Sequence, residues 1–150
     1  MDAPALLPFY LILKLMTYTA WCALAVWMFG DRSGNMWLAS FSYGIVRFFL
    51  GFFFGGIIFL ISSLVFESIY NLPMRGILTY LIVYVPIRWI EWSLIAALID
   101  RTPSFFISFL FVKTKQQLFW RLGGIIVSFI ADIPMIIAMD GALPTGRFMC

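Results

Sequence analysis

The sequence contains no histidine, few charged residues and only two cysteines, and each shortage excludes a class of protein. Without imidazole the chain cannot build His-ligated haem, chlorophyll or zinc sites, or catalytic dyads and triads based on histidine. Cys22 and Cys150 are too few to ligate an iron–sulfur cluster. Charged residues make up 11% of the chain and apolar residues 63%, whereas an ordinary soluble domain has about 25% and about 45–50%. Because so little polar surface cannot cover a globule of 150 residues in water, composition predicts an integral membrane protein.

Long apolar runs indicate how often the chain crosses the membrane, since a spanning helix needs about 20 mostly apolar residues. The runs predict an all-α bundle of about four transmembrane helices, with three or five as alternatives, over residues 8–29, 44–66, 76–99 and 119–139. The first run contains Lys14 and has no basic residue before it, so we interpret it as a retained helix rather than a cleaved signal peptide. Without an internal repeat or a second domain, residues 1–150 are expected to form a single transmembrane domain.

Two segments are assigned to the membrane interface. Residues 37–43 precede the second span and contain Trp and Tyr, which favour the headgroup level. Residues 104–118 begin with an aromatic-rich apolar stretch that is too short to span and then become basic, a pattern typical of an interfacial amphipathic helix or a re-entrant piece. We expect three basic residues to contact anionic lipid headgroups there, namely Lys113, Lys115 and Arg121.

The distribution of Lys and Arg between loops predicts the orientation. The first and third loops hold five basic residues: Arg32, Arg101, Lys113, Lys115 and Arg121. The N-terminus, the second loop and the tail hold only Arg75 and Arg147. Because cytoplasmic loops are enriched in Lys and Arg, this excess of five basic residues over two predicts that both termini lie outside the cytoplasm. We expect the membrane to be a bacterial inner (plasma) membrane.

Five ionisable residues fall inside the spans: Lys14, Arg47, Arg88, Glu91 and Asp132. Inserting such a charged side chain at the centre of a bilayer costs at least about 2.5–3.5 kcal/mol. Such groups therefore usually pair with one another, extend toward the interface or line a polar cavity. Helical rise places Lys14 about 9 Å and Asp132 about 11 Å deep from the same face. The spacing predicts two buried pairs, Lys14 with Asp132, and Arg47 or Arg88 with Glu91.

These charges have several possible roles. Pairs that merely hold the helices together are the favoured interpretation, ahead of a proton or ion pathway and of contacts with a partner subunit or a lipid headgroup. Three cations against two carboxylates leave one positive charge over.

Small residues and prolines mark further features of the spans. Gly51 and Gly55 form a G-x-x-x-G motif followed by Gly56, which favours close helix packing inside the chain or with another chain. Pro86 is expected to kink the third span or to free a backbone carbonyl, beside an Arg88 that can stack on a Trp. The Gly123–Gly124 pair and Pro134 are expected to loosen the backbone of the fourth span, as in the broken helices of some transporters.

No pattern points to an enzyme. The chain has no G-x-S-x-G motif and no paired Asp or Glu at metal-ligand spacing, and an enzyme acting on lipid is the least favoured class. Scattered basic residues argue against nucleic-acid binding. The seventeen Phe side chains suit lipid or carotenoid, quinone or chlorophyll tails, and their spacing leaves any cofactor unknown.

The favoured function is a non-catalytic integral membrane subunit, or an assembly or stabilising factor, of a larger membrane protein complex. Its expected partners are membrane lipids and other integral membrane subunits or further copies of itself. The alternative is a small oligomeric transporter or channel for an ion, proton or small solute that uses Glu91 or Asp132.

Overall fold

The computed structural model describes residues 3–30, 34–68, 80–100 and 111–138. All regular structure within these ranges is helical, in the order α1 (Ala3–Phe29), α2 (Met36–Ser68), the π-helical turn η1 (Tyr80–Tyr84), α4 (Val85–Asp100) and α6 (Lys115–Ala138). Four of the helices in the described part of the chain are long and apolar enough to cross a membrane. This confirms the prediction of an all-α fold with about four helices that are long and apolar enough to span a membrane.

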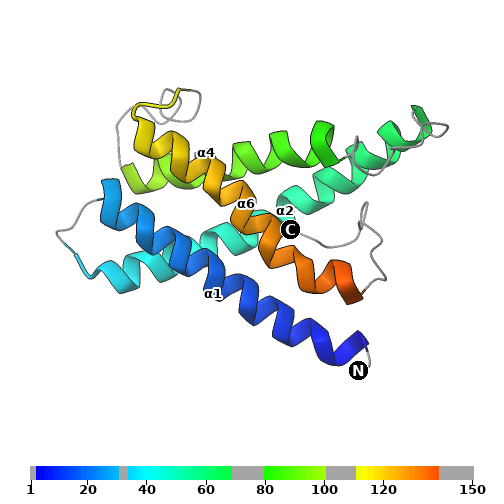
Figure 1. Ribbon diagram of the computed structural model, residues 1–150, viewed down its shortest axis with the longest axis horizontal. Coiled ribbons are helices and arrows are strands. Elements are labelled where there is room, and N and C mark those ends of the chain that lie inside the picture. The colour runs from blue at the N-terminus through cyan, green and yellow to red at the C-terminus, as the bar shows by residue number, and fades with distance from the viewer. Residues whose placement is uncertain (1–2, 31–33, 69–79, 101–110, 139–150) are drawn as a thin grey trace.

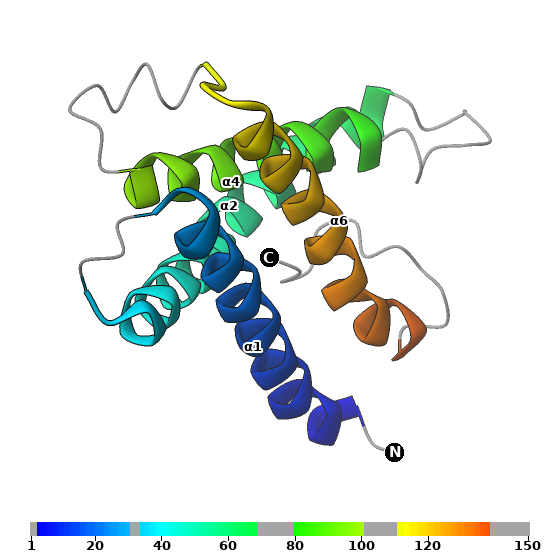
Figure 2. The ribbon, with the colours of Figure 1, turned by 60° about the vertical axis from the view of Figure 1, so that its left-hand side comes forward.

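The helices alternate in direction along the chain. One end of the bundle holds the end of α1, the start of α2, the end of α4 and the start of α6, and the opposite end holds their other termini (Figure 1). In the view of Figure 2, α1 and α6 run in opposite directions on one side of the bundle, and α4 crosses behind them. Helix α1 packs on α2, α4 and α6, and α4 also packs on α2 and α6, so α1 and α4 contribute most of the interior.

The helix boundaries differ from the predicted spans at several places. Helix α2 begins at Met36, so residues 37–43 belong to it, and its 33 residues correspond to a length of about 50 Å. The fourth predicted span starts earlier than expected, because α6 begins at Lys115 and runs for 24 residues. Residues 115–118 of the predicted interfacial segment are therefore the first turn of α6, while residues 104–110 lie outside the described part of the chain. The described part of the chain contains no separate interfacial helix.

A glycine and an asparagine form the turn between α1 and α2. The N–H of Gly30 donates to the carbonyls of Ala25 and Val26 at 3.2 and 3.1 Å, which closes the last turn of α1. The Oδ1 atom of Asn35 accepts from the N–H groups of Trp37 and Leu38 at 3.0 and 3.3 Å. Asn35 is thus the N-cap of α2, and it satisfies donors that would otherwise lack a partner.

Pro86 is accommodated by a change of helix type. The π-helical turn η1 lies directly before α4, in which Pro86 is the second residue. A proline has no N–H and its ring clashes with the carbonyl four residues earlier, and a wider turn relieves that clash. The expected irregularity at Pro86 therefore takes the form of a π-helical turn. In contrast, α6 continues as one helix through Gly123, Gly124 and Pro134.

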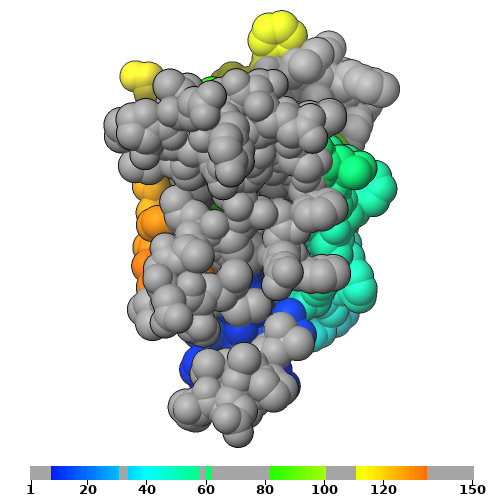
Figure 3. All heavy atoms as spheres, turned by 90° about the vertical axis from the view of Figure 1, so that its right-hand side faces the viewer, coloured from blue at the N-terminus to red at the C-terminus, as the bar shows by residue number. Residues whose placement is uncertain are grey.

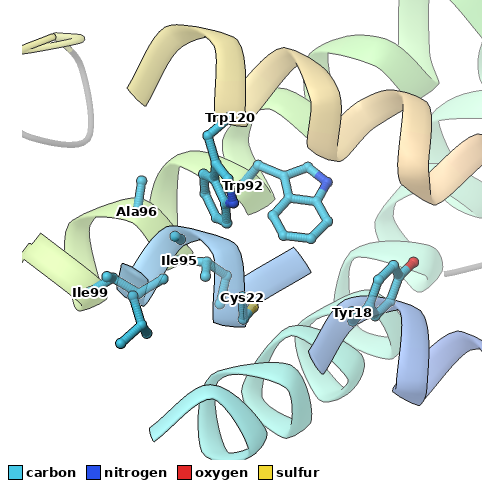
Figure 4. Packing of buried hydrophobic residues seen from close by; sticks show 9 residues of the cluster. Tyr18, Cys22, Trp92, Ile95, Ala96, Ile99 and Trp120 are labelled. Carbon is cyan, nitrogen blue, oxygen red and sulfur yellow. The ribbon is translucent and has the colours of Figure 1, made fainter. Parts of the chain in front are cut away.

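Aromatic side chains fill the centre of the bundle, where the indoles of Trp92 and Trp120 lie between α1, α4 and α6 (Figure 4). Their ring centroids are 5.1 Å apart in an edge-to-face arrangement, and Tyr18 meets Trp92 in the same way at 5.7 Å. Trp21 and Trp120 also bond reciprocally, each indole N–H donating to the other residue's backbone carbonyl at 3.1 and 2.9 Å. These contacts fix α1 against α6 and α4.

Glycines allow the helices to approach closely at two positions outside the predicted G-x-x-x-G motif. A Cβ atom at Gly44 of α2 would lie 2.9 Å from the Cα of Thr19 in α1, and one at Gly124 of α6 would lie 2.5 Å from the indole of Trp92. Gly51 is buried, but no atom of the described residues lies within 4 Å of a Cβ built at Gly56. The helix contact of α1 with α2 therefore depends on Gly44.

The outer surface of the described helices is apolar and aromatic. In the space-filling view of Figure 3, α2 and α6 form opposite flanks of the molecule. Large exposed side chains on these two helices include Phe49, Phe53, Phe119 and Ile126, each at least 60% exposed. This is the surface that a helix bundle presents to lipid or to neighbouring membrane helices.

Candidate functional site: a buried charge network

Asp132 of α6 collects donors from three helical segments. Its Oδ1 atom lies 2.7 Å from the Nζ of Lys14 and 2.8 Å from the hydroxyl of Tyr10, both on α1. Lys14 also donates to the Tyr10 hydroxyl at 2.6 Å. On the other side of the carboxylate, Oδ2 accepts from the hydroxyl of Tyr84 and lies 3.5 Å from Nη2 of Arg88. The predicted Lys14–Asp132 pair is confirmed.

Glu91 of α4 is held by two arginines. Its Oε2 atom lies 2.5 Å from Nη2 of Arg47 on α2 and 2.8 Å from Nη1 of Arg88, three residues earlier on α4. The second predicted pair is therefore confirmed with both candidate cations present at once.

Arg88 joins the two predicted pairs into one network. It contacts Glu91 through Nη1 and Asp132 through Nη2, and Nη2 also donates to the Tyr84 hydroxyl at 2.6 Å. The side chains of the five charged residues are between 0 and 3% exposed. Charges from α1, α2, α4 and α6 thus pair with one another inside the protein, away from its outer surface.

Aromatic rings surround the cations. The guanidinium carbon of Arg47 lies 4.7 Å from the ring centre of Tyr18 and 4.8 Å from that of Trp92. Arg88 lies over the ring of Tyr84 at 4.5 Å. The negative faces of the rings stabilise these buried cations further.

Helical spacing explains why these side chains share one interior. Tyr10, Lys14 and Tyr18 follow one another at intervals of four on α1, and Tyr84 and Arg88 do so across η1 and α4. Residues four apart lie on one helix face, so each helix presents a polar stripe to the same region. Ser128, one turn before Asp132 on α6, accepts a hydrogen bond from the indole N–H of Trp92 at 3.1 Å.

The basic residues assigned to lipid headgroups lie in different environments. Arg121 is buried, donates to the hydroxyl of Ser93 at 3.1 Å and lies 5.8 Å from the ring centre of Trp89. This burial differs from the headgroup contact expected for Arg121. Lys113 is partly exposed and pairs with Asp100 at 2.8 Å, and Lys115 is exposed at the start of α6.

Several polar atoms at the Arg47 end of the network have no hydrogen-bond partner among the residues that the structure describes. They are Nε and Nη1 of Arg47, Oε1 of Glu91 and the hydroxyl of Tyr18. All three residues are 0% exposed. A buried polar atom without a hydrogen-bond partner destabilises the folded state by about 1–3 kcal/mol, and by more when it is charged. The Arg47 end is therefore the part of the network whose hydrogen-bonding groups are least satisfied.

The arrangement defines the kind of ligand that the network suits. Asp132 and Glu91 each face two cations, and Oε2 of Glu91 is shared by two arginines while its Oε1 has no hydrogen-bond partner among the described residues. Among the described residues, no three Cys, Asp or Glu side chains lie close enough together to hold a metal ion. The field of Arg47 and Arg88 favours anions and repels cations and protons.

The charged residues of the network were predicted from the sequence, but the uncharged residues that hydrogen-bond to them were not. Tyr10, Tyr84 and Ser128 were not among the candidate residues, although Tyr10 lies one turn from Lys14 and Tyr84 one turn from Arg88. A tyrosine four residues from a buried cation on the same helix is the signal that would have found both hydroxyls.

No protein-family model, curated protein or solved structure matches this chain. Functional proposals therefore depend on its own geometry.

Proposed function

We propose that the protein is a non-catalytic integral membrane subunit, or an assembly or stabilising factor, of a larger membrane protein complex. One observation carries the proposal: the charges within the spans are turned inward and bonded to one another. Asp132 and Glu91 are engaged by Lys14, Arg47 and Arg88, and none of these side chains is more than 3% exposed. Groups held in this way fix the positions of four helices rather than act on a substrate.

The outside of the bundle supports the same proposal. Phe53 on α2 and Phe119 on α6 are 67% and 70% exposed, and they represent a surface of large apolar side chains on several helices. A rigid bundle with such a surface is suited to packing beside other membrane helices, where close van der Waals contact drives association.

We further propose a bacterial inner membrane with both termini outside the cytoplasm. Without the buried Arg121, the first and third loops and the start of α6 still hold four basic residues against two in the other loop and the tail, and this excess supports the orientation because cytoplasmic loops are enriched in Lys and Arg. Lys113 and Lys115 would then meet the anionic lipids of the cytoplasmic leaflet. Both lie close to the start of α6, which is at the same end of the bundle as the start of α2 (Figure 1).

Purification of the tagged full chain from its native membrane in mild detergent tests the subunit proposal. We expect it to migrate on a native gel with larger membrane proteins, in a ratio that is constant between preparations by mass spectrometry. An unrelated membrane protein with the same tag is the control for carry-over. A chain that purifies alone, or as a symmetric oligomer, would contradict the proposal.

A small oligomeric transporter or channel is the second candidate, and the continuity of the charge network favours it. Hydrogen bonds and ion pairs connect Lys14 to Arg47 through Asp132, Arg88 and Glu91 without a break. Reconstitution in liposomes tests this candidate, since flux that is lost in Glu91→Gln or Asp132→Asn while the fold is kept would support it. Wild-type liposomes that conduct neither protons nor small ions above the level of empty liposomes would exclude it.

A further inference from the structure

We propose that Tyr84 couples α6 to α2, so that displacing either helix changes the contacts that hold the other. The coupling passes through a hydrogen-bonded bridge of three residues, Asp132 on α6, Tyr84 in the π-helical turn η1 and Arg88 on α4. It is a property of this chain alone, so it goes beyond the subunit function proposed above and does not depend on it.

The chemistry of its two neighbours fixes the direction of both hydrogen bonds of Tyr84. An arginine side chain can only donate and an ionised carboxylate can only accept, whereas a phenol hydroxyl can do both. The hydroxyl therefore accepts from Nη2 of Arg88, at 2.6 Å, and donates to Oδ2 of Asp132. Without this hydroxyl the two charged groups would face each other at 3.5 Å, beyond the usual length of a hydrogen bond.

Charged contacts extend the bridge to α2. Nη1 of Arg88 lies 2.8 Å from Oε2 of Glu91, and the same oxygen lies 2.5 Å from Nη2 of Arg47 on α2. In a buried chain of this kind each hydrogen bond polarises the next, so the strength of one contact depends on its neighbours. A change in the position of Arg88 therefore changes how firmly Glu91 binds Arg47.

Apolar packing provides a second connection between α2 and the bridge. One small hydrophobic cluster contains side chains of α2, η1 and α4, namely Phe54, Ile57, Val83, Tyr84 and Ile87. Because close-packed side chains transmit strain, a shift of this part of α2 displaces Tyr84.

Direct packing between α2 and α6 does not replace this route. The two helices form opposite flanks of the molecule, and among the described residues their backbones do not pack on each other (Figure 3). Nη2 of Arg47 and the hydroxyl of Ser128 lie 3.5 Å apart, which is a long contact. Tyr84 is partly exposed, unlike the five buried charges, and lies in an irregular turn, so the bridge can open locally while the rest of the network stays closed.

A double-mutant cycle between the two flanks tests the coupling. Arg47→Lys keeps the charge and loses the planar guanidinium, and Asp132→Asn removes the carboxylate charge with little change of shape. The losses of the single and double variants, measured by unfolding in detergent, should deviate from additivity by about fivefold or more in the unfolding equilibrium constant. In a Tyr84→Phe background the same cycle should be additive to within about twofold. Additive losses in the wild-type background, or an unchanged deviation in Tyr84→Phe, would overturn the proposal.

Two further backgrounds are matched controls, and both should keep the coupling. Tyr10 also donates to Asp132, at 2.8 Å, but to Oδ1, so Tyr10→Phe removes a hydroxyl from the same carboxylate and leaves the bridge intact. Ser128→Ala removes the direct contact with Arg47. If Tyr10→Phe abolished the coupling, the loss would follow from any weakening of Asp132, and if Ser128→Ala did so, the direct contact would be the route. Either result would overturn the role of Tyr84.

Nuclear magnetic resonance of arginine side chains gives a second measurement that requires no unfolding and no loss of a charge. In protein labelled with isotope-enriched arginine, the Nε–H resonance of Arg47 is identified by its absence in Arg47→Lys. Tyr84→Phe, which keeps the aromatic ring, should shift this resonance, whereas Tyr10→Phe should leave it in place. An Arg47 resonance that is unmoved by Tyr84→Phe, or moved equally by Tyr10→Phe, would contradict the coupling.

Discussion

Lys14 on α1 and Asp132 on α6 lie 2.7 Å apart although 118 residues separate them in the chain. Their meeting was expected from depth, since Lys14 lies six residues after the start of the first predicted span and Asp132 seven residues before the end of the fourth, about two turns of helix in each case. The pair ties the first membrane helix to the last. The apolar outer surface of the bundle can exist because such pairs keep the formal charges inside.

Removing the charge of Glu91 should destabilise the protein strongly. Glu91→Gln leaves Arg47 and Arg88 without their shared carboxylate, and the loss of one partner of a buried ion pair costs about 3–5 kcal/mol. The matched control is Asp100→Asn, whose carboxylate pairs with a Lys113 that is 33% exposed, and which should cost about 1 kcal/mol or less. Unfolding in detergent, followed by circular dichroism, measures both changes. Equal losses in the two variants would contradict the assignment of Glu91 to the network.

A methyl group at Gly124 should displace the central tryptophan. A Cβ there would lie 2.5 Å from the indole of Trp92, and overpacking of this kind costs about 1–3 kcal/mol. Gly56→Ala is the control, because the described residues leave its Cβ free space and alanine favours a helix by about 0.5–1 kcal/mol. Gly124→Ala should therefore lower the unfolding temperature and Gly56→Ala should keep or raise it. The opposite order would show that α6 does not approach Trp92 this closely.

The hydroxyl of Tyr10 should contribute to stability as part of the network. It donates to Asp132 at 2.8 Å and accepts from Lys14 at 2.6 Å, and hydrogen bonds to charged groups contribute about 1.5–3 kcal/mol. We expect Tyr10→Phe to lower the free energy of unfolding by about this amount, measured by denaturant titration in detergent. Tyr43→Phe, which removes an exposed hydroxyl, should change it by less than about 1 kcal/mol. If Tyr10→Phe left the free energy of unfolding unchanged, the Tyr10 hydroxyl would not contribute to the network.

Cysteine labelling should reveal the alternation of the helices. Asn35→Cys and Lys113→Cys, made with Cys150→Ser while the buried Cys22 stays in place, should react with a membrane-impermeant maleimide from one side only. Asn71→Cys, between the second and third spans, should react from the other side. Sealed vesicles of both orientations give the measurement, and the proposed orientation requires the first two positions to be cytoplasmic. Labelling of all three positions from one side would contradict four crossings.

The charges were predictable from sequence because their cost in a membrane is high and their depth can be counted. Lys14 and Asp132 each stand alone in an apolar run, and Glu91 shares its run only with Arg88, so helical rise gives each a depth and restricts its partners. The bridge made by Arg88 between both carboxylates was not predictable. It depends on how α4 is rotated against α6, and that rotation is set by packing around Trp92 rather than by local sequence.

The remaining differences have the same origin. Arg121 was expected to contact a lipid headgroup because it follows Lys113 and Lys115 in the sequence. It lies instead within α6, which directs its side chain toward Ser93. Close packing was expected at Gly56, beside a known motif, but no atom of the described residues lies within 4 Å of a Cβ built there, whereas Gly44 makes a close approach to α1 without any motif around it. Which glycine meets a neighbouring helix depends on where two helices cross, and periodicity does not contain that information.

A double-mutant cycle between Lys14 and Asp132 tests most directly whether buried pairing holds the helices together. Each single change, Lys14→Met or Asp132→Leu, leaves one buried charge with fewer partners and should cost about 3–5 kcal/mol. The double variant should be more stable than the sum of the two losses predicts, with a coupling energy of about 1–3 kcal/mol in unfolding titrations. Losses that add to within about 0.5 kcal/mol would show that the two charges do not stabilise each other.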